Sequence, residues 1–155
     1  MLKFLKLLIF FALLQSCSPK TDVIYQPNNK IDPYSSYKEG LEAFEQNNFF
    51  FANKKFSEAE INFKVPRLAA KSAIMASYSL YGINFYNQAE ENLNRYLTTY
   101  PGDINVMYAH YLLAIISFEQ ISDERHDLKP LLDAEKKIDF FLKKYPNSEY
   151  AMDLS

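Results

Sequence analysis

From Tyr34 onward, apolar residues recur at intervals of three and four, the spacing that places side chains on one face of an α-helix. Prolines occur here only at wide intervals, where each can end one helix and begin the next. The pattern predicts three pairs of helices, followed by a seventh helix that begins in NSEYAMDLS, with Asn147 or Ser148 as its cap. The first helices are expected over 34–47, 67–84 and 103–119, and the second helices over 49–64, 86–100 and 131–145.

A short motif recurs in the second helix of each pair. It consists of an alanine, a large apolar residue four positions later and a small or aromatic residue three positions after that, which all fall on one helix face. A proline follows each time, and Gly40 lies twelve residues before the first of these alanines. This arrangement is typical of the tetratricopeptide repeat, in which the alanine lets the partner helix approach closely. The three sets are Ala52-Phe56-Ala59, Ala89-Leu93-Tyr96 and Ala134-Ile138-Phe141.

The distances between the sets support a true repeat. Ala52 and Ala89 are 37 residues apart, close to the repeat length of about 34. Ala134 follows Ala89 by 45 residues, which places extra residues near 120–130. We therefore predict an all-α tetratricopeptide-repeat helical solenoid over 34–155, with about three repeats plus the start of a fourth. The alternative is generic pairing of amphipathic helices without true repeats.

The N-terminus predicts a lipoprotein signal. Lys3 and Lys6 accompany an apolar run that ends near Leu14, too short to cross a bilayer but typical of a signal peptide. The following Leu-Gln-Ser-Cys resembles a bacterial lipobox, although the glutamine departs from its usual pattern. We expect a signal peptide over 1–16, lipidation (palmitate) of Cys17, and a flexible tether over 17–33. The alternative is an ordinary signal peptide, or an uncleaved anchor, with an incidental cysteine.

Composition narrows the function to binding. Loss of Lys3 and Lys6 with the signal would take the formal net charge from −2 to −4, and no basic block points to nucleic acid. No HExxH, GxSxG, P-loop or CxxC motif is present, and a lone helical histidine such as His110 is more often packed than catalytic. We therefore expect that the chain is not an enzyme and that it binds no cofactor or metal. The competing enzyme hypothesis is a cell-wall hydrolase or its regulatory domain.

Three features together resemble the BamD family of lipoproteins, subunits of the outer-membrane β-barrel assembly (BAM) complex. They are Cys17, the segment YAHYLLAIISFEQISDERHD (108–127) and the segment YPNSEYA (145–151). Pro66 departs from the family pattern, and family members continue for several more helices, so we expect a fragment or a truncated form. The resemblance implies a non-enzymatic scaffold, lipid-anchored at the periplasmic face of the outer membrane. Its implied partners are the barrel-assembly outer-membrane subunit, other assembly lipoproteins and unfolded outer-membrane proteins.

Candidate binding residues follow from the expected inner face of the solenoid, which the first helices line. Twelve tyrosines and thirteen phenylalanines indicate either interlocking cores or an aromatic groove for peptides. Asp123, Arg125 and Asp127 match the family's insertion; they either bind a partner or hold their loop together through an Arg–carboxylate bridge. The alternative function is an outer-membrane repeat lipoprotein for secretion, pilus or cell-wall assembly. The aromatic candidates are Tyr37, Phe44, Tyr78, Tyr81, Tyr108 and Tyr111, each of which is alternatively a packing residue.

Overall fold

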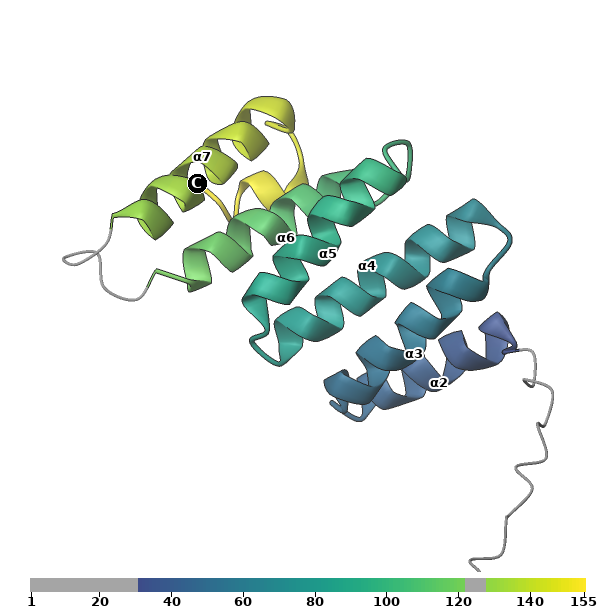
Figure 1. Ribbon diagram of the computed structural model, residues 1–155. Coiled ribbons are helices and arrows are strands. Elements are labelled where there is room, and N and C mark those ends of the chain that lie inside the picture. Colours follow the sequence, from purple (N-terminus) through teal and green to yellow (C-terminus); the bar gives the residue numbers. More distant parts are fainter. Residues whose placement is uncertain (1–30, 122–127) are drawn as a thin grey trace, which may run out of the picture.

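The computed structural model describes residues 31–121 and 128–155. Those residues form α-helices in antiparallel pairs with no strand, which confirms the predicted all-α class. Consecutive helices lie side by side and build an elongated stack (Figure 1). The helices are α2 (Pro33–Glu45), α3 (Phe49–Asn62), α4 (Pro66–Gly82), α5 (Tyr86–Thr99), α6 (Val106–Glu119) and α7 (Lys129–Lys144), followed by the 3-10 turn η1 (Glu149–Ala151).

The helix pairs fall where the pattern predicts them, and most boundaries agree within two residues, with two larger differences. Helix α6 begins three residues later than expected, because Asp103 holds the preceding turn: its carboxylate accepts hydrogen bonds from the Tyr96 hydroxyl (2.5 Å) and the Asn105 backbone N–H (3.0 Å). The expected seventh helix forms only the 3-10 turn η1, and the Ser148 side chain makes no capping hydrogen bond there. Among the described residues, no helix is both long and apolar enough to span a bilayer.

The repeat motif forms the core of each helix pair. Ala52, Phe56 and Ala59 are fully buried, as are Ala89, Leu93 and Tyr96. In the third set Ala134 and Phe141 are buried, whereas Ile138 is only half-buried. Gly40 explains the close approach of α2 to α3: a Cβ atom at this position would lie 2.8 Å from the Phe56 ring. These contacts support the repeat interpretation over generic helix pairing.

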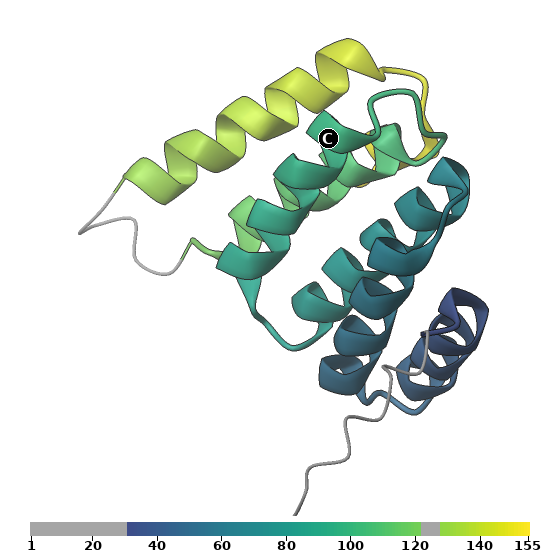
Figure 2. The same ribbon diagram turned by 45° about the vertical axis from the view of Figure 1, so that its right-hand side comes forward.

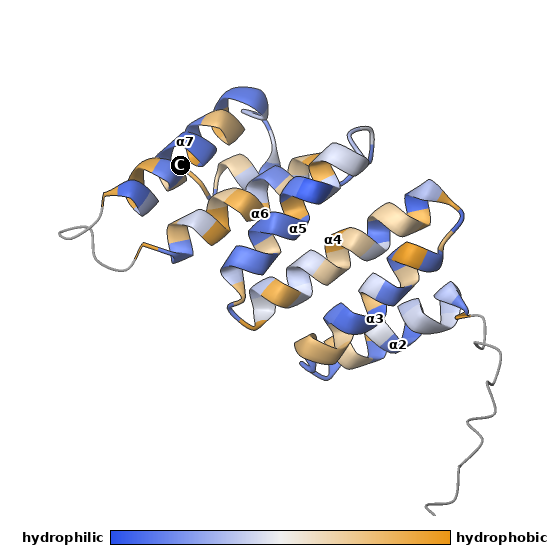
Figure 3. Cartoon of the chain, viewed as in Figure 1, coloured by the Kyte–Doolittle hydropathy of each residue, from blue (hydrophilic) through white to orange (hydrophobic). Residues whose placement is uncertain are grey.

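Helix α4 is the most enclosed helix of the stack, and its buried side chains are mostly alanine and serine. The Oγ atoms of Ser72, Ser77 and Ser79 donate hydrogen bonds of 2.8–2.9 Å to carbonyl oxygens four residues earlier. This bonding satisfies the hydroxyls inside the helix itself, so α3 and α5 can pack closely against it. Figures 2 and 3 show α4 between its neighbours, with mixed blue and orange along the flanking helices.

Two ion pairs connect the second helices of successive repeats. Arg95 of α5 donates two hydrogen bonds, 2.6 and 2.8 Å long, to both carboxylate oxygens of Glu60 on α3. Glu60 is only 8% exposed and accepts a further bond from the Tyr100 hydroxyl. On the other side of α5, Lys137 of α7 lies 2.6 Å from both Glu90 and the Ser117 hydroxyl. These links fix neighbouring repeats relative to each other.

The first two repeats share a left-handed turn between their helices. Asn47 (φ 57°) and Asn84 (φ 59°) are 37 residues apart, the same interval as between Ala52 and Ala89. In both turns the N–H of the next residue donates to a carbonyl five residues back, at Ala43 and at Leu80. Asparagine tolerates a positive φ better than other residues with a side chain, apart from aspartate. The turns therefore repeat with the helices, a feature that the apolar pattern alone does not reveal.

Replacing Asn84 with valine is expected to lower the free energy of unfolding by about 1–2 kcal/mol, since a β-branched residue is strained at positive φ. Asn84→Gly removes that strain and is the matched control, with a change within about 0.5 kcal/mol. Urea denaturation followed by circular dichroism measures both variants. Equal stability of the valine and glycine variants would show that the turn is not held in this conformation.

Candidate binding groove

A cavity of about 600 Å³ opens between α2, α4 and the turn before α6. Phe44 of α2, the apolar side chains of α4 and Tyr108 of α6 line it, and Ile104 of the turn, 87% exposed, stands at its edge. The cavity is therefore built by the first helices of three successive repeats, the helices that the sequence assigns to the inner face. Its lining is mostly apolar with a few polar groups, the usual character of a binding pocket.

Five of the six predicted aromatic residues form one continuous row beside this cavity. The Tyr78 ring lies 5.5 Å from Phe44, 5.8 Å from Tyr81 and 6.3 Å from Tyr108, measured between centroids. Tyr108 in turn lies 6.1 Å from Tyr111. We call Phe44, Tyr78, Tyr81, Tyr108 and Tyr111 the aromatic row. All five side chains are half-buried, so each packs against another ring and still presents surface to solvent.

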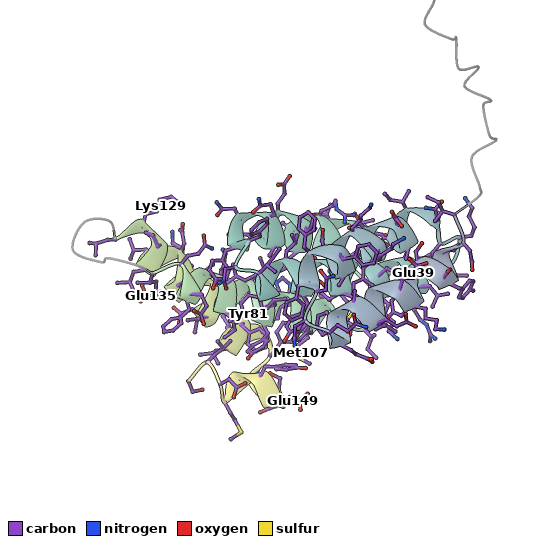
Figure 4. The ribbon with its side chains drawn as sticks, turned by 90° about the horizontal axis from the view of Figure 1, so that it is seen from below. Glu39, Tyr81, Met107, Lys129, Glu135 and Glu149 are labelled. Atoms are coloured by element: carbon purple, nitrogen blue, oxygen red, sulfur yellow. The ribbon has the colours of Figure 1, made fainter. Side chains whose placement is uncertain are left out.

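The aromatic row continues into the C-terminal segment. Tyr111 stacks on Tyr150 of η1 with a centroid distance of 4.6 Å, and its hydroxyl donates to Asp153 at 3.2 Å. Tyr150 also lies 5.7 Å from Tyr108. In Figure 4, which views the stack from below, Tyr81 lies toward the side on which Glu149 of η1 lies. The segment after α7 therefore packs directly on the row.

Burial raises the pKa values of three tyrosines of the row, Tyr81, Tyr108 and Tyr111. It raises the pKa of Tyr108 well above the usual value, with neighbouring tyrosines adding to the shift. The pKa values of Tyr81 and Tyr111 are raised as well, chiefly by burial and then by the carboxylates of Glu119 and Asp153 respectively. Neutral phenols both donate and accept hydrogen bonds. The row can therefore meet an apolar side chain and a backbone amide at the same time.

A family model described as "YfiO: Outer membrane lipoprotein" matches residues 29–155. The chain belongs to the YfiO family. Two relatives carry the name "Outer membrane protein assembly factor BamD", which confirms the resemblance drawn from the sequence.

The relative from Rickettsia prowazekii is 27% identical over 150 residues, which are 96% of this chain and 58% of that protein. The relative from Caulobacter vibrioides is 32% identical over 117 residues, which are 76% of this chain and 38% of that protein. This YfiO-family chain thus spans little more than half the length of the first relative, and less of the second.

Tyr37 is the predicted candidate that lies apart from the row. Its ring packs on the rings of Phe56 and Phe63, with centroid distances of 5.4 and 6.5 Å. Tyr37 therefore packs within the first helix pair. The remaining sequence candidates of this YfiO-family chain, Cys17 and the three insertion residues Asp123, Arg125 and Asp127, lie outside the described residues. Among the residues that the structure describes, no cluster of three His, Cys, Asp or Glu side chains is arranged to hold a metal ion.

Two cations at the groove were missed by sequence reasoning. Arg67 and Lys71 line the cavity from α4, and the Lys71 ammonium lies 5.4 Å from the centre of the Tyr37 ring. Both side chains are exposed. Their spacing of four residues places them on one helix face, which is the only sequence signal that could have revealed them.

The nearest acidic group, Asp103, is engaged within its own turn. Burial opposes its ionisation, but hydrogen bonds from Tyr96 and Asn105 outweigh this effect and lower the pKa of Asp103. The groove therefore combines aromatic rings with two exposed cations and a carboxylate that is already hydrogen-bonded.

His110 is a packing residue, as expected of a lone helical histidine. Its ring lies 4.9 Å from the Phe140 ring, and burial together with the nearby charge of Lys144 lowers the pKa of His110.

Proposed function

We propose that this chain is a non-enzymatic, lipid-anchored scaffold that recognises unfolded β-barrel proteins during their assembly into the outer membrane. The observation that carries the proposal is the aromatic row beside the groove, supplied by the first helices of three repeats. Membership of an outer-membrane lipoprotein family, and the names of the two relatives, support the same reading.

The chemistry of the groove suits an unfolded barrel strand. Such strands alternate apolar or aromatic residues with polar ones, and successive side chains point to opposite faces. One face of an extended strand would lie on the aromatic row, while its unpaired backbone groups meet the tyrosine hydroxyls. Arg67 and Lys71 line the same cavity as the row and would favour strands that carry acidic residues close to the face that lies on the row.

Anchoring and docking complete the proposal. Acylation of Cys17 would hold the chain at the periplasmic face of the outer membrane, with residues 17–33 as a tether. The partners are the barrel-assembly subunit of the outer membrane and other assembly lipoproteins. Asp123, Arg125 and Asp127 are proposed to contact one of them, or to brace their own loop. No cofactor or metal takes part.

Replacing Tyr78 with alanine is expected to weaken binding of a peptide from a barrel strand about tenfold, because Tyr78 touches three other rings of the row. Fluorescence anisotropy of a labelled peptide with the full chain measures the affinity. Phe50→Ala is the matched control, since Phe50 is an exposed aromatic residue on α3, outside the groove. Equal affinities of the two variants would exclude the aromatic row as the binding surface.

The biological partner requires a second experiment. Native protein immunoprecipitated from crosslinked envelopes is expected to bring down a β-barrel assembly subunit, identified by mass spectrometry. Recovery of a secretion, pilus or cell-wall component without that subunit would replace the proposal with the alternative function.

A further inference from the structure

The end of the stack at which α2 begins carries an unusual set of exposed side chains. Helix α2 starts there, α3 ends there and α4 starts there, at the right-hand side of Figure 1. The T-shaped contact between the rings of Tyr34 and Phe63, with centroids 5.0 Å apart, confirms that the start of α2 meets the end of α3. We call the exposed residues at this end the tether-side patch: Ile31, Tyr34, Ile61, Lys64 and Val65.

The patch is apolar and basic at once. Ile61 is 79% exposed and Tyr34 62%, although both residue types usually bury most of their surface. Lys64 is exposed between Ile61 and Val65, and no ion pair to it is found in the described part of the chain. Arg67, at the rim of the groove, adds a second exposed cation close by in sequence.

The acidic groups near this end are already engaged. Asp32 caps α2 by accepting hydrogen bonds from the backbone N–H groups of Tyr34 and Ser35, each 3.2 Å long. Glu60 is buried against Arg95. Asp32 keeps its negative charge, but the two exposed cations Lys64 and Arg67 outnumber it, so the excess charge at this end is positive and the complementary partner is anionic.

The position of the patch identifies the kind of anionic partner. Only residues 18–30 separate Cys17 from Ile31, where the patch starts. A flexible chain of that length has a root-mean-square end-to-end distance of about 20 Å. An anchored chain would thus keep this end of the stack, more than any other, beside the bilayer. Lysine and tyrosine next to exposed aliphatic residues are the side chains that suit the boundary between lipid and water.

We propose that the tether-side patch docks on the surface of an anionic phospholipid bilayer and so orients the helix stack at the membrane. The inference rests on the lipid anchor of the proposed function and adds a second contact, made by the folded domain. A single lipid anchor fixes only the distance from the membrane, whereas two separated contacts fix orientation as well. The attraction acts within a Debye length of about 8 Å at physiological salt, a distance that the tether permits.

A single-cysteine label tests the proposal, because acylation blocks Cys17 and no other cysteine is present. The full chain carrying Ile61→Cys is purified with its lipid, labelled with an environment-sensitive dye and reconstituted in vesicles. The vesicles contain phosphatidylcholine with or without phosphatidylglycerol, and a lipid-borne quencher. The matched control is Phe50→Cys, at the opposite end of helix α3 and 69% exposed. Circular dichroism verifies that both variants are folded.

The dye at position 61 is expected to shift to the blue and to be quenched in vesicles that contain phosphatidylglycerol, and the dye at position 50 is not. When Lys64→Glu is added to the Ile61→Cys variant, the ratio of docked to undocked protein is expected to fall about fivefold or more. Equal quenching at 61 and 50, or no response to Lys64→Glu, would overturn the proposal. So would shielding of position 61 only after a polypeptide is added, which would make the patch a protein-binding surface.

Vesicle flotation separates this inference from the anchor on which it rests. If the protein floats with the vesicles and its mass includes the acyl chains, the lipid anchor is present. The quenching of the dye at position 61 then shows by itself whether the tether-side patch docks on the bilayer. If the mass lacks the acyl chains and the protein fails to float, the anchor fails and the docking proposal falls with it.

Discussion

Arg95→Ala is expected to lower the free energy of unfolding by about 1.5–3 kcal/mol, because it leaves the largely buried carboxylate of Glu60 without its cation and two of its hydrogen bonds. Glu60 has 7% of its side chain exposed and Arg95 has 46%, so water would replace the two hydrogen bonds from Arg95 only in part. The hydroxyl of Tyr100 alone would remain as a donor. Urea denaturation monitored by circular dichroism gives the change in free energy.

Two further variants make this result specific to the ion pair. Arg67→Ala removes an exposed cation of the same type and is expected to change stability by less than about 0.5 kcal/mol. Replacing both Glu60 and Arg95 with leucine removes the unpaired charge and is expected to recover most of the loss. If Arg95→Ala were as stable as Arg67→Ala, the pair would contribute nothing to the joint between the first two repeats.

Phe56→Ala is expected to cost about 3–5 kcal/mol, since it opens a cavity at the centre of the first repeat. Phe56 is fully buried, and its ring fills the space that Gly40 leaves on α2. The rings of Tyr37 and Phe44 pack on it from either side, at 5.4 and 6.5 Å. Thermal and urea denaturation both measure the loss.

The control for Phe56 lies on the same helix. Phe50→Ala removes an equally large ring that is 69% exposed, and stability should change by less than about 0.5 kcal/mol. Phe56→Leu keeps much of the side-chain volume, so its loss of stability should lie between the losses of Phe50→Ala and Phe56→Ala. Similar losses for Phe50→Ala and Phe56→Ala would mean that the repeat motif does not form the core of this helix pair.

The order and the faces of the helices could be predicted because the repeat motif specifies both. A residue set such as Ala89-Leu93-Tyr96 fixes which side of α5 is buried, and the structure buries all three completely. The start of α6 could not be predicted, because it depends on the bond between Tyr96 and Asp103. Such a contact between polar side chains leaves no trace in the apolar periodicity.

The groove was predicted in part. Tyr78 and Tyr108 could be selected as groove residues because both lie on the first helix of a repeat. Their rings do meet across neighbouring repeats. The same reasoning selected Tyr37, although the structure turns its ring toward Phe56 instead of the row. Arg67 and Lys71 escaped notice because exposed polar residues have no periodic constraint. Their importance appears only when the cavity that they border is seen.

The small side chains of α4 also determine how much conformational entropy the fold gives up. Alanine has no rotamers to lose on burial, whereas long side chains lose considerable freedom. The most enclosed helix of the stack therefore becomes ordered with little loss of side-chain entropy. Its packing depends on the approach of backbones and not on the choice of rotamers. Thermal motion of core side chains consequently has little influence on how closely α4 lies against α3 and α5.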